Sequence, residues 1–133
     1  MALILVDTSV LIESQRAGVD LERFIDDDDA PAIAAITLAE LQVGVGLATG
    51  RKRERRQLLF DEVVALFPVV DYDSSVAAVH ARLLVETRRA GRPRSSHDLI
   101  IAASAVASGR LLLSLDARGF EGLDGVQVRI PER

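Results

Sequence analysis

Short apolar runs alternate along the chain with segments whose apolar residues recur every three or four positions. Apolar runs of this kind, bounded by polar or turn-forming residues, are typical of strands buried on both faces of a parallel sheet. They predict strands at Leu3–Val6, Ala32–Ile36, Val69–Val70, Leu111–Leu115 and Val126–Ile130.

The segments between these strands have helical periodicity and recognisable ends. Two begin with the spacing of a capping box, T-x-x-E from Thr37 and S-x-x-D from Ser95. Two stop at a glycine, Gly91 and Gly109, which favours the left-handed turn that follows many helices. The predicted helices are Ser9–Arg16, Leu21–Asp26, Thr37–Ala48, Lys52–Phe67, Ser74–Ala90 and Ser96–Ser108.

Strands that alternate with helices indicate an α/β domain with a mostly parallel sheet. A chain of 133 residues with 49% hydrophobic side chains is the size of one domain, residues 1–133, with enough apolar surface for a core. It has no cysteine and no apolar stretch long enough to span a membrane, so we expect a soluble, cytoplasmic protein without membrane partners. The formal net charge of −4 means that contacts with nucleic acid would need local basic patches or bound cations.

Four acids fall where the α/β pattern places ligands, beyond the carboxyl ends of the strands. Asp7 and Asp116 follow predicted strands, and Glu40 and Asp98 lie in the first turns of predicted helices. Each alone is explained as a helix cap. Together they would repel one another, and a hard divalent cation such as Mg²⁺ would relieve that repulsion. Mn²⁺ is the expected substitute. The run Asp26–Asp29, by contrast, is interpreted as a solvated loop before Pro31.

At these acids the chain resembles a known family. The stretches LILVDTSVLI, ITLAELQVG, GRPRSSHDLIIAASA and LLLSLDARGF are similar, in this order, to the motifs of PIN-domain nucleases. Among these the chain is most similar to VapC-like ribonuclease toxins of toxin–antitoxin pairs. The resemblance covers almost the whole chain and implies a three-layer α/β/α fold around about five strands.

The resemblance also implies a site and an activity. Asp7, Glu40, Asp98 and Asp116 would form the acidic cluster that holds the metal, with Asp7 and Asp98 as the main ligands. Glu40 would bind the metal through water or orient the attacking water, and Asp116 would complete the pocket. Thr8, Ser9 and Ser114 would be the polar residues around it. The implied reaction is hydrolysis of RNA phosphodiesters by a metal-activated water. The implied partners are RNA, a cognate antitoxin and a second copy of the chain in a homodimer.

One position departs from the family pattern. Many relatives carry another acid or a histidine just before the phenylalanine at position 120, where this chain has Gly119. The number of metal ions, one or two, therefore stays open. A catalytically weak scaffold that binds RNA or protein, and a nuclease that cuts DNA, are the alternatives.

Several basic residues are candidates for RNA contact, namely Arg51, Arg53, Arg92 and Arg94. His97 neighbours Asp98 but is predicted to point about 100° away from it around the helix. The antitoxin is expected to bind as a helix in an apolar groove. The expected groove walls are Val10 to Ile12 and the helix that carries Leu41 and Val45.

Overall fold

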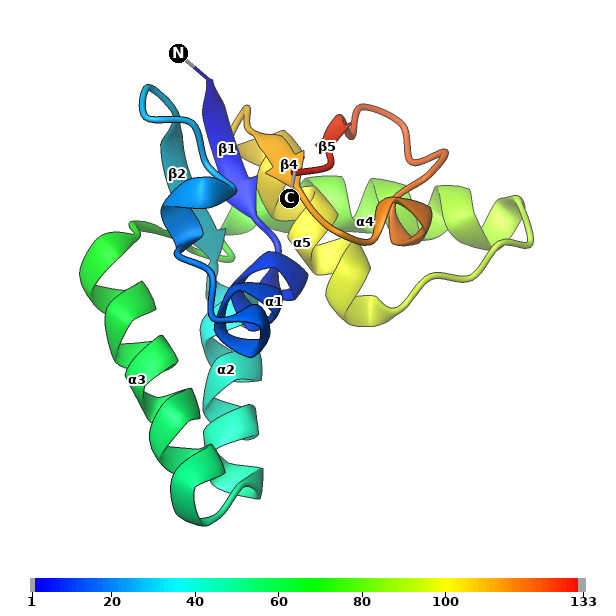
Figure 1. The fold of residues 1–133 in the computed structure, drawn as a ribbon. Coiled ribbons are helices and arrows are strands. Elements are labelled where there is room, and N and C mark those ends of the chain that lie inside the picture. The colour runs from blue at the N-terminus through cyan, green and yellow to red at the C-terminus, as the bar shows by residue number, and fades with distance from the viewer. Residues whose placement is uncertain (1, 132–133) are drawn as a thin grey trace.

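Five short parallel strands run through the centre of the computed structural model, which describes residues 2–131 (Figure 1). The strands are β1 (Leu3–Val6), β2 (Ala30–Ala34), β3 (Val69–Val70), β4 (Leu111–Leu113) and β5 (Val128–Arg129), in the order β3-β2-β1-β4-β5. All four pairings are parallel, and Leu5 of β1 lies in register with Ala32 and with Leu112. The predicted five-stranded parallel sheet is confirmed.

Five α-helices connect these strands within the described residues, and each matches a predicted helix to within a few positions. They are α1 (Thr8–Ala17), α2 (Ala35–Leu47), α3 (Gly50–Leu66), α4 (Ser74–Arg89) and α5 (Ser96–Ala107), with the 3₁₀ turns η1 (Leu21–Arg23) and η2 (Ala117–Gly119). Gly91 and Gly109 follow α4 and α5 with φ of 64° and 67°, as predicted for residues that end helices.

Two local predictions are wrong. The helix predicted for Leu21–Asp26 is only the 3₁₀ turn η1, because the aspartates that follow favour turns over helix. The strand predicted at Ala32–Ile36 lies two residues earlier and includes Pro31, which a strand tolerates near its start. Helix α2 therefore begins before Thr37. Thr37 is inside the helix instead of capping it.

The sheet is covered by helices on both faces, which confirms the three-layer arrangement (Figure 1). Successive residues of a strand point to opposite faces. Leu5 packs with α4 and α5, whereas Ile4 and Val6 pack with α1 and α3. Helices α2 and α3 extend beyond the sheet as a long antiparallel pair (Figure 1).

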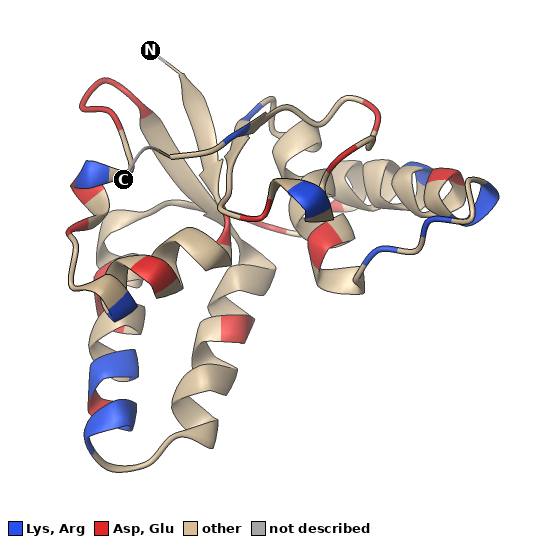
Figure 2. Cartoon of the chain, turned by 45° about the vertical axis from the view of Figure 1, so that its right-hand side comes forward, with Lys and Arg blue, Asp and Glu red and all other residues tan. Residues whose placement is uncertain are grey.

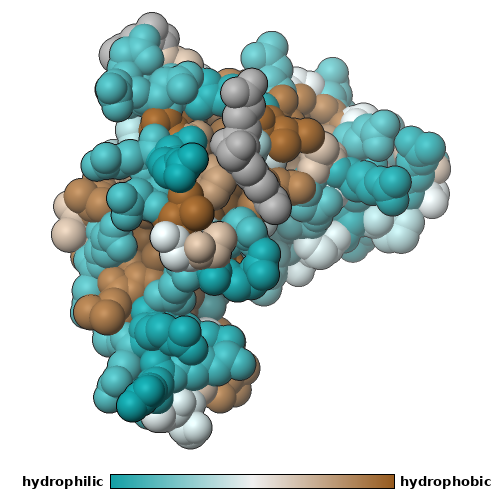
Figure 3. All heavy atoms as spheres, viewed as in Figure 1, coloured by the Kyte–Doolittle hydropathy of each residue, from teal (hydrophilic) through white to brown (hydrophobic). Residues whose placement is uncertain are grey.

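The α2–α3 pair carries exposed apolar side chains, seen as brown atoms among teal ones in Figure 3. They are Val43, Leu47, Leu58, Val64 and Leu66. Among the described residues, no helix is long and apolar enough to cross a membrane.

Candidate functional site

The four predicted acids lie at the edge of the sheet where β1 and β4 end. Asp7 follows β1 and precedes α1, Asp116 follows β4 and precedes η2, and Asp98 lies in the first turn of α5. Glu40 comes from α2, which follows β2. Figure 2 shows red segments gathered at this edge. The connections of the parallel sheet thus bring four separate stretches of sequence together.

The pKa of the Asp98 carboxyl reflects the closeness of the four acids. Burial of the Asp98 carboxyl raises its pKa above the ordinary value. The negative charges of Asp7, Asp116 and Glu40 raise the pKa further, against a hydrogen bond with Ser95 that lowers it. A carboxylate that faces three others in this way is relieved by a bound cation.

Asp7 is held by two serines. Its Oδ2 accepts hydrogen bonds from Oγ of Ser9 (2.8 Å) and Oγ of Ser114 (2.7 Å), and the residue is only 5% exposed. The Ser114 hydroxyl also accepts from the backbone N–H of Asp116 (3.0 Å). Among the described residues, the other carboxylate oxygen of Asp7 accepts no hydrogen bond, which leaves it available as a ligand.

Glu40 is held by Thr8, the residue next to Asp7. Thr8 Oγ1 donates to Glu40 Oε1 (3.0 Å) and lies 3.1 Å from Thr37 Oγ1. The capping box predicted for Thr37 and Glu40 is therefore wrong, and Thr37 belongs instead to a buried hydroxyl pair beneath Glu40. His97 was predicted to point away from Asp98. Its Nδ1 lies 3.5 Å from Glu40 Oε2, at the exposed rim of the cluster.

Asp98 and Asp116 meet at Gly119. A Cβ atom on Gly119 would lie 2.8 Å from Asp116 Oδ2, closer than such atoms approach, and 3.0 Å from Asp98 Oδ2, a tight contact. Asp116 Oδ1 accepts from the Gly119 N–H (3.2 Å), and Ser95 Oγ accepts from the Asp98 N–H (3.0 Å) as the capping box predicted. A side chain at 119 would therefore require the carboxylate ends of Asp98 and Asp116 to shift. Gly119 thus does more than leave out an acid at this position.

The donor set suits a hard divalent cation. It consists of carboxylate and hydroxyl oxygens, which Mg²⁺ and Mn²⁺ bind well. Within residues 2–131, no three of the four acids have ligand atoms that all lie within 4.8 Å of one another. This spacing fits an ion that keeps several waters and is held by few carboxylates.

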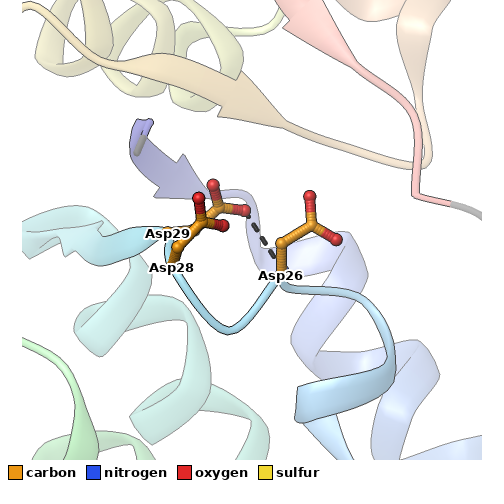
Figure 4. Close-up of side chains that lie close together, drawn as sticks. All are labelled: Asp26, Asp28 and Asp29. Atoms are coloured by element: carbon orange, nitrogen blue, oxygen red, sulfur yellow. Dashed lines mark hydrogen bonds between the residues drawn. The ribbon is translucent and has the colours of Figure 1, made fainter.

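A tighter group of acids lies elsewhere, at Asp26, Asp28 and Asp29, between η1 and β2 (Figure 4). Asp29 is not solvated as predicted. Its side chain is 3% exposed and accepts from Arg129 (2.6 Å) and from the Asp26 N–H (3.1 Å). The hydrogen bond from Arg129 lowers the pKa of Asp29. This carboxylate ties the loop to β5, which gives it a structural role.

The predicted basic contacts divide into two kinds. Arg51, Arg53 and Arg92 are exposed. Arg94, however, donates from Nη1 to the carbonyl of Arg118 (2.6 Å) and from Nη2 to the carbonyl of Glu121. Its guanidinium holds the segment that contains Gly119 against the start of α5. We found no sequence pattern that predicted this role.

Comparison with known proteins identifies the family and agrees with the fold. The chain matches the PIN domain family over residues 4–126. It is 28% identical over 126 residues to ribonuclease VapC1 from Rickettsia felis, with 94% of this chain and 93% of the relative covered. It is 29% identical over 126 residues to a tRNA(fMet)-specific endonuclease VapC from Shigella flexneri, with 92% and 93% covered.

Among solved structures, the chain is similar to a VapBC-5 toxin–antitoxin structure from Mycobacterium tuberculosis. The TM-score is 0.78 at 30% identity, and all of both chains is covered. The family match spans nearly the whole chain and includes the segments that carry all four acids. This chain belongs to the PIN-domain family.

Proposed function

We propose that this chain is a metal-dependent endoribonuclease that acts as the toxin of a toxin–antitoxin pair. The observation that carries the proposal is the Asp98 carboxyl, whose pKa is raised by burial and by the charges of Asp7, Asp116 and Glu40. Relatives that span the same length are named ribonucleases and tRNA(fMet)-specific endonucleases.

PIN nucleases depend on a metal ion, and we propose Mg²⁺, with Mn²⁺ as a substitute. Asp7 and Asp98 would be its main protein ligands, with Asp116 completing the pocket. When bound, such an ion acidifies a water molecule and stabilises charge on the phosphate and on the leaving oxygen.

Hydroxyl side chains of the protein orient the acids. Ser9 and Ser114 hold one oxygen of Asp7 and thereby turn the other toward the cluster. Thr8 holds Oε1 of Glu40, and the second oxygen, which lies near His97, would orient the attacking water. Because Thr8 and Ser9 both lie in the first turn of α1, small movements of that turn would disturb Glu40 and Asp7 at once.

The proposal includes an antitoxin, a homodimer and a cytoplasmic location, where RNA is available. An antitoxin helix needs an exposed apolar surface. The groove walls predicted from the sequence need correction, because Val10, Leu11, Leu41 and Val45 are buried in the core. The exposed apolar residues of the α1–α2–α3 region are instead Ile12, Val43, Leu47, Leu58, Val64 and Leu66.

Incubation of the protein with structured RNA and with single-stranded DNA, each in Mg²⁺ or EDTA, tests the activity. We expect RNA cleavage in Mg²⁺ only, and none by the Asp7→Ala variant with its fold retained. Cleavage that persists in EDTA or in this variant would refute the proposal. Cleavage of DNA alone would indicate a deoxyribonuclease, and no cleavage of either would indicate a binding scaffold.

A further inference from the structure

A basic hollow lies between α1 and the first half of α3, outside the acidic cluster. It measures about 290 Å³ and is lined by Ile12, Gln15, Arg16, Lys52, Arg55 and Arg56, which we call the basic cleft. Four of these six residues are cations, in a chain whose formal net charge is −4. Figure 2 shows the corresponding blue segments on α3. Such a local concentration of positive charge favours the binding of a polyanion.

Hydrogen bonds between helices fix the walls of the cleft. Arg56 Nη1 donates to the carbonyl of Gly44 on α2 (2.6 Å), and Gln15 Nε2 donates to the carbonyl of Arg55. Arg16 is paired with Glu13 (2.7 Å). Among the described residues, no hydrogen bond or ion pair occupies the side chains of Lys52 or Arg55. These two exposed cations are therefore available to a ligand.

The lining also distinguishes between ligands. An amphipathic helix needs a stripe of apolar residues to bind against, and Ile12 is the only large apolar residue among the six. Lys52 and Arg55 instead offer charge without an apolar surface. Phosphate groups of a nucleic-acid strand match this lining better than a protein helix does.

The position of the cleft relative to the acids gives it a place in the reaction. Ser9, which holds Asp7, lies on the same face of α1 as Ile12 and Arg16, at helical spacing. At a rise of 1.5 Å per residue, Arg16 lies about 10 Å along the helix from Ser9. A nucleic-acid strand that lies in the cleft can therefore reach the acidic cluster within a few nucleotides.

We propose that the basic cleft binds phosphates of the RNA substrate close to the bond that is cut. This inference rests on the proposed ribonuclease function. It assigns Lys52 and Arg55 to the RNA strand, in place of Arg51 and Arg53 from the sequence analysis. Arg53 faces a different hollow, which Glu54 and Gln57 also line.

Helix α3 provides the matched control. The double variant Lys52→Gln/Arg55→Gln and the control Arg51→Gln/Arg53→Gln each remove two charges from exposed positions of one helix. Binding of a fluorescein-labelled, mixed-sequence, single-stranded RNA of about 20 nucleotides is measured by anisotropy in EDTA, over a series of salt concentrations. Thermal melts verify that each variant is folded.

We expect the cleft variant to bind about tenfold more weakly at about 50 mM salt, and the control less than about twofold more weakly. The slope of log K against log salt should fall by about 1.4 in the cleft variant, since each phosphate contact on a single strand contributes about 0.7. The single variant Lys52→Gln should lower the slope by about 0.7 and serves if the double variant does not fold.

Equal losses in the two double variants would overturn the proposal, because bulk charge alone would explain them. Competition by a polyglutamate peptide of equal charge, as strong as that by unlabelled RNA, would mean an acidic-peptide site and would also overturn it. The assay needs no metal, so it is independent of cleavage. Selective binding through the cleft without any RNA cleavage in Mg²⁺ would refute the ribonuclease and leave the binding site supported.

Discussion

The Ser114 hydroxyl donates a 2.7 Å hydrogen bond to Asp7 Oδ2 across 107 positions of sequence. The two residues follow neighbouring strands, β4 and β1. Because the same hydroxyl accepts from the Asp116 N–H, one buried serine orients two of the four acids.

Replacement of Ser114 by alanine should therefore impair both stability and cleavage. The variant loses the hydrogen bond to the buried Asp7 carboxylate and also removes the acceptor of the Asp116 N–H. Loss of a hydrogen bond to a charged group costs about 1.5–3 kcal/mol in the free energy of unfolding. We expect kcat for RNA cleavage to fall, because Asp7 would lose one of its two supports. Urea unfolding and single-turnover cleavage measure the two effects.

Ser104→Ala is the control for this variant. Ser104 is also fully buried and donates one hydrogen bond, to the carbonyl of Ile100 within α5. It should lose stability with no change in kcat. Equal loss of activity in both variants would show that the effect of Ser114 is on the fold alone.

Asp98→Asn should separate metal binding from helix capping. The variant keeps the Asp98 N–H bond to Ser95 but removes one of the converging charges. In EDTA it should be as stable as the wild type or more stable. The wild type should gain about 2.7 kcal/mol when Mg²⁺ is a hundredfold above its Kd, and the variant much less. Thermal melts with EDTA and with Mg²⁺ test this.

Asp73→Asn is the corresponding control. The Asp73 carboxylate accepts from the Val76 N–H and caps α4, with no part in the cluster. This variant should lose stability in EDTA and keep the full metal response. If Asp98→Asn behaves in the same way, Asp98 is only a helix cap.

The metal-free protein should become less stable as pH rises through the raised pKa of Asp98. The folded state binds the Asp98 proton more tightly than the unfolded chain does, since burial and three carboxylates raise this pKa. This contribution of Asp98 to the free energy of unfolding is fully present below the ordinary aspartate pKa, near pH 4. It is lost once the pH exceeds the raised pKa of the folded state. Melts in EDTA across this range measure it as the difference between wild type and Asp98→Asn.

Metal binding should have the opposite pH dependence, because the ligand must be deprotonated. The Mg²⁺-induced rise in Tm should therefore shrink as pH falls below the raised pKa of Asp98. Two results would contradict the convergence of the four acids. One is a difference in stability between wild type and Asp98→Asn that does not change with pH in EDTA. The other is a Mg²⁺-induced rise in Tm that becomes larger as pH falls.

Gly119→Ala should weaken metal binding more than it weakens the fold. The added Cβ would displace the carboxylate ends of Asp98 and Asp116, which lie within 3.0 Å of its position. We expect a smaller Mg²⁺-induced rise in Tm and slower cleavage. Gly46→Ala in α2 adds a methyl group with nothing within 4 Å and should stabilise the helix by about 1 kcal/mol without changing either readout. An unchanged metal response in Gly119→Ala would remove Gly119 from the site.

The strands and the four acids could be predicted because local pattern determines them. A short apolar run buries itself on both faces of a sheet, and the residue after it must lie at the sheet edge. The sequence pattern determined the start and end of β2 less well. Alanines and Pro31 fit a strand or a turn about equally well, and pairing with β1 decided the register.

Long-range contacts account for what the sequence analysis missed. Thr37 matched a capping box locally, but the shift of β2 placed it beneath Glu40 and beside Thr8. Arg94 resembled a ligand for phosphate until its partners were known to be the carbonyls of Arg118 and Glu121. Backbone acceptors carry no signal in side-chain patterns, so such a role becomes visible only in the folded chain.

The central place of β1 has a consequence for biosynthesis. One of the two neighbours of this strand, β4, is made more than a hundred residues after β1. A nascent or truncated chain that stops before β4 lacks half of the pairing of β1, and it also lacks Ser114 and Asp116. Since pairing between distant segments forms late and slowly, a cell translating this message would not encounter an assembled acidic centre until residue 116 had been added.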